Sequence, residues 1–325
     1  MFKGCTALTG GGKWSANLVS LNIGDYAFQE MYQGCTALKS WTSTLTVGTS
    51  RTVGQYAFNG TYKGCSALTG SSFTLNTPGS VGNAAFMDMF NGCTALTNSG
   101  NSISLSLDIN NAYSFKQMFY GCNNMTVAPN ITNTTCTTAV GNYAFQNMFY
   151  NCKKIVDINI DRIINRPGKT LGTYCYDNMF TYCEQLSLGE YIVYGNNISE
   201  MISYLPKLKC QTMGTYSCQN MFAYCGAMKV APLLVVKTTN TNCYQSMFTY
   251  CGTLKCIIDV TSDGNTSNNA YQNALEYAAG YGTVYCGSTT ISSNWSSKSK
   301  GSNWIYVVDT AQLDSLSYEA YYQTT

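Results

Sequence analysis

The sequence predicts an α/β repeat solenoid of about ten similar units, and two observations carry this prediction. The first is that the phrase Met-Phe-x-Gly-Cys, seen at Met1–Cys5, returns in variants along most of the chain. Its cysteine recurs about every 30 residues, at Cys5, Cys35, Cys65, Cys93, Cys122, Cys152, Cys183, Cys225 and Cys251. Self-similarity at a period of roughly 20–50 residues is typical of units that bury their apolar faces by stacking. The second is that the apolar spacing changes within each unit from a helical to a strand-like period.

The first part of each unit has the apolar spacing of a short helix. In residues 141–152 the apolar side chains follow the spacing i, i+1, i+4, i+5 and i+8, at Ala144, Phe145, Met148, Phe149 and Cys152. This spacing places them on one face of a helix, while Gln146, Asn147 and Tyr150 point outward.

Short strands follow the cysteine. Apolar and polar residues alternate at Ile103–Leu107 and Ile158–Ile160, as in half-buried strands. Leu233–Val236 and Cys256–Val260 are more continuously apolar, which indicates better-buried strands. Strands stack about 4.8 Å apart whereas helices need about 8–10 Å. We therefore expect the array to curve, with its strands on the concave side.

The repeated phrase resembles a known family. Ala27-Phe28 followed by Cys35–Leu38, and Ala57-Phe58 followed by Cys65–Leu68, are similar to BspA-like leucine-rich repeats of bacterial surface proteins. The Met-Phe-x-Gly-Cys variant resembles units common in gut Bacteroidetes and their phages. The resemblance covers about residues 1–308. It implies a curved leucine-rich-repeat-like array with a role in adhesion or surface recognition, and it supplies no catalytic motif.

The domain organisation is predicted as a solenoid over residues 1–279, with an insertion at about 189–209, followed by a cap and tail over 280–325. In the insertion, Ser199 is expected to cap a short helix that ends before Pro206. Residues 269–278 are a decayed tenth unit.

In the cap, Ser-rich 288–302 is expected as a loop, Trp304–Val308 as a strand and Thr310–Gln323 as a short helix. Because Met1 falls inside a repeat unit, we expect the chain to continue a larger polypeptide or assembly.

The composition argues against several function classes. The 325 residues carry a net charge of +2 and 10% charged residues, without the basic patch that nucleic acids need. No apolar run is long enough for membrane insertion. The chain has no His, the commonest general base, and no two carboxylates are placed as a glycosidase needs, so we expect no enzyme and no catalytic residue.

The 16 cysteines are expected to be mostly free thiols that pack the stacked units. Disulfides among the cysteines outside the repeat positions remain an alternative. Because there is no Cys-x-x-Cys and no His, neither a metal nor a cofactor is expected.

Tyrosines are the candidate ligand-binding residues. Tyr182, Tyr224 and Tyr250 precede the cysteine in three consecutive units and should form a row, while Tyr120 and Tyr150 lie one position earlier and point outward. Tyr191 and Tyr194 in the insertion complete the set. Exposed tyrosines suit contact with glycan or protein, although packing against neighbouring coils would also explain them. A different set is expected in the repeat core: Tyr26, Tyr56, Tyr113, Tyr143, Tyr174 and Tyr216.

The sequence therefore favours non-catalytic surface recognition of a cell-surface glycan or protein. The chain would be extracellular, as part of a bacterial surface adhesin or of a phage receptor-binding fibre. The alternative is a structural spacer or virion decoration protein without its own ligand. Clustering of exposed aromatic residues on one face would distinguish a binder from a spacer.

Overall fold

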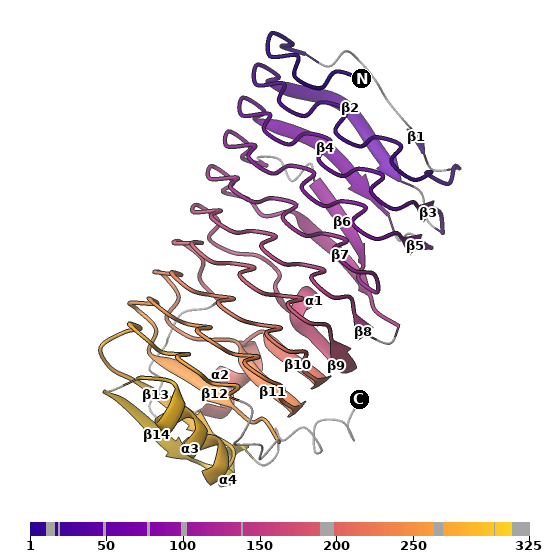
Figure 1. The fold of residues 1–325 in the computed structure, drawn as a ribbon. Coiled ribbons are helices and arrows are strands. Elements are labelled where there is room, and N and C mark those ends of the chain that lie inside the picture. Colours follow the sequence, from indigo (N-terminus) through magenta and orange to yellow (C-terminus); the bar gives the residue numbers. More distant parts are fainter. Residues whose placement is uncertain are drawn as a thin grey trace.

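The computed structural model describes residues 1–10, 17–18, 20–47, 50–76, 79–98, 103–137, 139–188, 198–262, 269–301 and 303–313. It shows a parallel β-solenoid, in which successive coils stack along one axis (Figure 1). The predicted repeat solenoid is confirmed at this level.

Every strand pair in the described chain is parallel, and the strands form three sheets. The first has the order β1 (Asn17–Leu18), β2 (Ser40–Val47), β4 (Gly70–Leu75), β6 (Ile103–Asp108) and β7 (Asn130–Thr135). The second runs through β8 (Ala139–Val140), β9 (Asn165–Leu171), β10 (Lys207–Thr212), β11 (Leu233–Thr238), β12 (Cys256–Asp259), β13 (Gly282–Cys286) and β14 (Trp304–Val308). A small third sheet pairs β3 (Thr52–Val53) with β5 (Ser80–Val81).

The predicted helix of each unit is wrong, because the segment is a run of β-turns. In residues 141–152 every fourth residue has a left-handed backbone, with φ of 58° at Tyr143, 57° at Asn147 and 60° at Asn151. An α-helix has no such residues. A spacing of i, i+1, i+4, i+5 and i+8 fits a period of four as well as the 3.6-residue period of a helix, so the apolar pattern alone did not separate them.

Backbone hydrogen bonds explain why the turns stack. Alternate N–H groups close turns within the coil, as from Gln146 to the Tyr143 carbonyl at 3.2 Å. The others donate to the next coil, as from Phe145 to the Cys175 carbonyl at 2.8 Å. A helix would use all of these groups internally, whereas here half of them join one coil to the next.

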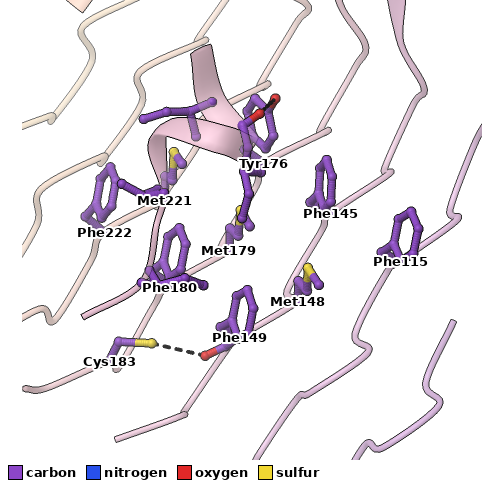
Figure 2. Close-up of a cluster of buried hydrophobic side chains, with 14 of the residues drawn as sticks. Phe115, Phe145, Met148, Phe149, Tyr176, Met179, Phe180, Cys183, Met221 and Phe222 are labelled. Atoms are coloured by element: carbon purple, nitrogen blue, oxygen red, sulfur yellow. Dashed lines mark hydrogen bonds between the residues drawn. The ribbon is translucent and has the colours of Figure 1, made fainter. Parts of the chain in front are cut away.

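The core aromatic residues stack in the same register. Rings from successive coils lie 5.0–5.9 Å apart, as in the ladder through Phe115, Phe145 and Tyr176 that Figure 2 shows. This spacing is close to that of neighbouring strands. The mismatch between helix and strand spacing, on which the predicted curvature depended, is therefore absent.

The repeat cysteines form a buried ladder of hydrogen-bond donors. From Cys35 to Cys251, each repeat thiol donates to a carbonyl of the preceding coil, as from Cys183 to Phe149 at 3.1 Å (Figure 2) and from Cys152 to Phe119 at 3.1 Å. All 16 cysteines are free thiols, as expected. The sequence indicated their packing role but not this hydrogen bond.

The predicted strands at Ile103–Leu107, Leu233–Val236 and Cys256–Val260 correspond to β6, β11 and β12. The predicted strand at Ile158–Ile160 is wrong. Residues 156–160 form no strand, and α1 (Asp161–Ile164) follows them. β9 then pairs with β8 and β10 in the second sheet, so β6 is the only strand partner of β7 among the described residues. The two large sheets are thus separated by a break at residues 156–164.

The described end of the insertion packs on the outer face of the second sheet. As predicted, a short helix precedes Pro206, namely α2 (Ile198–Tyr204). Its Ile198 and Ile202 join a second hydrophobic cluster with Val235 of β11 and Ile258 of β12. This cover is why β11 and β12 are apolar on both faces.

The C-terminal cap closes the stack. Residues predicted as a Ser-rich loop form α3 (Thr289–Lys298), which Ser288 caps by accepting a hydrogen bond from the Ile291 N–H at 3.2 Å. The predicted strand at Trp304–Val308 is confirmed as β14. The expected helix over 310–323 is present at α4 (Thr310–Leu313), and its remainder lies outside the described residues.

A buried carboxylate ties the cap to the last coils. Asp259 of β12 accepts hydrogen bonds from the Tyr271 hydroxyl at 3.0 Å, from Trp295 Nε1 at 2.9 Å and from the Thr261 N–H at 2.9 Å. Burial raises the pKa of Asp259, although these hydrogen bonds act in the opposite direction.

Candidate binding face

The turn runs bring exposed residues from successive coils into columns. The left-handed positions lie four residues apart in each run, and equivalent positions of neighbouring coils stack. Residues that tolerate positive φ, mainly Asn and Gly, hold many of these positions. Tyrosine holds many of the others.

Six tyrosines form one continuous row, which we call the tyrosine row. Its members are Tyr120, Tyr150, Tyr182, Tyr224, Tyr250 and Tyr277, and neighbouring ring centroids lie 4.3–5.6 Å apart. The sequence predicted its first five members as two separate groups. They join because the rings of Tyr150 and Tyr182 make a T-shaped contact, although the two occupy different positions in their units.

The sequence did not predict Tyr277 as a member of the row. Tyr277 lies in the decayed tenth unit, where the loss of the cysteine hid the alignment. The signal was its position, since Asn269, Asn273 and Tyr277 repeat the four-residue spacing of the earlier runs. The ring of Tyr277 ends the row and is 65% exposed.

In the middle of the row, the ring faces are covered by neighbouring rings and are not open to solvent. Tyr182, Tyr224 and Tyr250 stack with interplanar angles of 19° or less, so each ring covers the faces of its neighbours. Desolvation, followed by the neighbouring Tyr182 and Tyr250, raises the pKa of Tyr224. The phenol of Tyr224 therefore stays uncharged at neutral pH and can take part in hydrogen bonds.

A second row corrects the assignment of six tyrosines to the core. Tyr113, Tyr143, Tyr174 and Tyr216 hold the first left-handed position of their runs and stack at 4.8–5.3 Å. Tyr26 and Tyr56 form a similar pair at 5.4 Å. These side chains are half-buried or exposed, and the core aromatic residues are instead those two positions later, such as Phe145 and Tyr176.

Polar side chains lie between the two rows. Gln146 donates to Asp177 at 2.8 Å, and Gln219 donates to Gln245 at 3.3 Å, so amide and carboxyl groups also connect neighbouring coils. Lys116 lies over the rings of Tyr113 and Tyr143, at 5.3 and 5.5 Å from their centroids. The face combines phenol, amide and few charged groups, which suits hydrogen bonding to a polar partner.

The remaining predicted site residues, Tyr191 and Tyr194, lie outside the described residues. Over the described ranges, no three His, Cys, Asp or Glu side chains are grouped so as to hold a metal ion. None of the helices in the described part of the chain is long and apolar enough to cross a membrane.

Comparisons with protein-family models, curated proteins and solved structures gave no match to this chain.

Proposed function

We propose that this chain is a non-catalytic recognition module that attaches to a cell surface through its tyrosine row. One observation carries the proposal: six coils each contribute a tyrosine, and these side chains form one uninterrupted line. Tyrosine is enriched at recognition surfaces because it combines a large apolar area with a polar tip. A spacer without a ligand needs no such clustering.

The partner in this proposal is a glycan or protein of a cell surface. The phenol hydroxyls and neighbouring amides can exchange hydrogen bonds with sugar hydroxyls or peptide groups. The BspA-like resemblance of the repeats supports a place in an extracellular bacterial adhesin or in the receptor-binding fibre of a phage. The low charged fraction, 10%, fits either setting.

A structural spacer or virion decoration protein is the second candidate. It is favoured by the mutual stacking of the tyrosine rings, since Tyr182, Tyr224 and Tyr250 cover each other's faces and so also strengthen the coil stack. The two candidates differ in what happens when the row is removed: a binder loses its partner, whereas a spacer loses only stability.

The test measures binding of the labelled protein to a panel of gut bacterial cells, with and without periodate treatment of their glycans. The test variant carries Tyr224→Asn and Tyr250→Asn, because Asn151 holds the equivalent left-handed position in another coil. The matched control carries Tyr143→Asn and Tyr174→Asn in the second row, whose position is occupied by Asn242 and Asn269 in later coils.

We expect the row variant to lose at least tenfold in cell binding and the control variant to retain it. Loss of wild-type binding after periodate would identify a glycan partner, and retention would identify a protein. Equal binding by wild type and row variant, or no binding to any cells, would reject the proposal in favour of the spacer.

A further inference from the structure

A cleft opens at the break between the two large sheets, on a part of the molecule separate from the tyrosine row. The segment 156–161 forms one wall, and Ser187, Leu188 and the end of the insertion at 203–207 form the other. Its volume of about 760 Å³ is within the usual size of small-ligand sites, about 300–1,000 Å³. The cleft exists because Ile158–Ile160 does not join the sheet and α2 lies beside the gap.

The lining of this cleft has an apolar floor and polar walls. Ile158, Ile160 and Leu205 are each at least nine-tenths buried and line its base. Asp157 and Asn159 are exposed, and no hydrogen bond or ion pair to either side chain occurs among the described residues. By contrast, Asp161 accepts from the Lys207 N–H at 2.9 Å. One carboxylate and one amide thus remain available to a ligand.

Tyr204 supplies an open aromatic face at this cleft. It is 82% exposed, and no ring contact to it occurs within the described part of the chain. Rings in the middle of the tyrosine row cover each other's faces, so the C–H face of a sugar cannot stack on them. Tyr204 has no such neighbour and can serve as a stacking platform.

A second cleft of about 580 Å³ adjoins the first. It lies between residues 126–131 and 156–159, so both clefts share the wall that carries Asp157 and Asn159. A ligand that crosses this shared wall would occupy both clefts. This arrangement fits a chain of two or more sugar rings better than a single ring.

We propose that these clefts bind a neutral oligosaccharide of hexoses or N-acetylhexosamines. One ring stacks on Tyr204, and the hydroxyls of the next hydrogen-bond to Asp157 and Asn159. The ligand class follows from the pairing of an open aromatic face with a carboxylate and an amide, whose donors and acceptors match sugar hydroxyls. This site rests on the proposed function only for its glycan class, since none of its residues belongs to the tyrosine row.

The test uses saturation-transfer NMR on the full chain with four disaccharide probes: cellobiose, lactose, maltose and chitobiose. We expect transfer to at least one of them, with a dissociation constant that rises at least tenfold in Tyr204→Ala and in Asp157→Asn. Tyr281→Ala is the matched control, since Tyr281 is 66% exposed but lies elsewhere, with Lys255 at 3.3 Å from its ring centroid.

Both test residues are exposed, so their variants should fold, and circular dichroism would verify this. Absence of transfer to all four probes overturns the inference, as does unchanged affinity in Tyr204→Ala. The Tyr224→Asn and Tyr250→Asn variant separates the two proposals. It should keep its sugar affinity while losing cell attachment, whereas Tyr204→Ala should lose sugar affinity and retain row-dependent attachment.

Discussion

The turn side and the strand side of each coil follow different rules. On the turn side, successive runs repeat one conformation, with a left-handed residue at every fourth position and alternate N–H groups bonded to the next coil. On the strand side, strand length varies from two residues in β8 to eight in β2, and the sheets break at 156–164. Strict backbone coupling holds the motif constant on one side, whereas the other side accommodates insertions and clefts.

The largest expected effect on stability comes from adding a methyl group to a glycine on the turn side. A Cβ at Gly172 would lie 2.6 Å from the Val140 carbonyl oxygen and 2.7 Å from the Gly141 carbonyl carbon, so two backbones would have to separate. We expect Gly172→Ala to lower the free energy of unfolding by about 3 kcal/mol or more, as in severe overpacking. Urea unfolding of this variant is the measurement.

Gly252→Ala is the control for this prediction, because a Cβ there meets nothing within 4 Å. This variant should lose less than about 1 kcal/mol in free energy of unfolding, the usual effect of a substitution in open space. Similar losses in both variants would show that the turn side is less tightly coupled than its hydrogen bonds indicate.

On the strand side, the free energy of unfolding should depend on Asp259, the carboxylate that holds the C-terminal cap. Asp259→Ala would leave the Thr261 N–H, the Tyr271 hydroxyl and Trp295 Nε1 without their acceptor. Since an unpaired buried donor costs about 1–3 kcal/mol, we expect a loss of about 3 kcal/mol in unfolding free energy. Asp157→Ala, at an exposed position, should change it little.

The same residue predicts a pH dependence. Burial raises the pKa of Asp259 in the folded protein, so the carboxyl favours folding while protonated and this contribution is lost as pH rises through the folded-state pKa. The stability of wild type relative to Asp259→Asn should therefore increase as pH falls from neutral toward about 4, the unfolded-state pKa. If the stability difference between wild type and Asp259→Asn did not change with pH, Asp259 would keep its charge in the folded protein.

A smaller effect should follow from changing a left-handed residue on the turn side. Asn147 has φ of 57°, a conformation that a β-branched side chain disfavours by about 1–2 kcal/mol. We expect Asn147→Val to lower the free energy of unfolding by this amount, and Asn147→Gly to be nearly neutral. Thermal unfolding of the pair measures the difference, and equal stability would contradict the need for a left-handed residue there.

The last prediction concerns reactivity more than stability. Burial raises the pKa of Cys65 and Cys251 to about 12, so these thiols should resist alkylation at pH 8, where the thiolate is the reactive form. Iodoacetamide followed by peptide mass spectrometry should modify exposed Cys5 and half-buried Cys136 in the native protein. Rapid native labelling of Cys65 or Cys251 would show that the ladder opens.

Much of the core could be predicted from the sequence. The burial of Phe145, Met148 and Cys152 follows from their spacing, and it is the same in a helix and in a run of turns. The backbone type could not be decided from that spacing. The better signal was the four-residue recurrence of Asn and Gly, which tolerate positive φ.

The candidate sites were predicted less well. The sequence predicted that Tyr120 and Tyr150 point outward and that Tyr182, Tyr224 and Tyr250 form a row, but not that the two groups are continuous. It assigned Tyr143 and its equivalents to the core, because their left-handed backbone was not recognised. The clefts at the break were not predicted, since Ile158–Ile160 has a strand-like pattern.

The repeats alone predict a stack of similar units and the side chains that each unit buries, because an apolar residue at a repeated position is covered by its equivalents in neighbouring coils. Only the tertiary structure decided what the backbone does between those residues. The choice between helix and turns depends on whether N–H groups bond within the coil or to the next, and that is settled only when coils stack. The same stacking joined the tyrosines into one row and opened the clefts where one coil left the sheet.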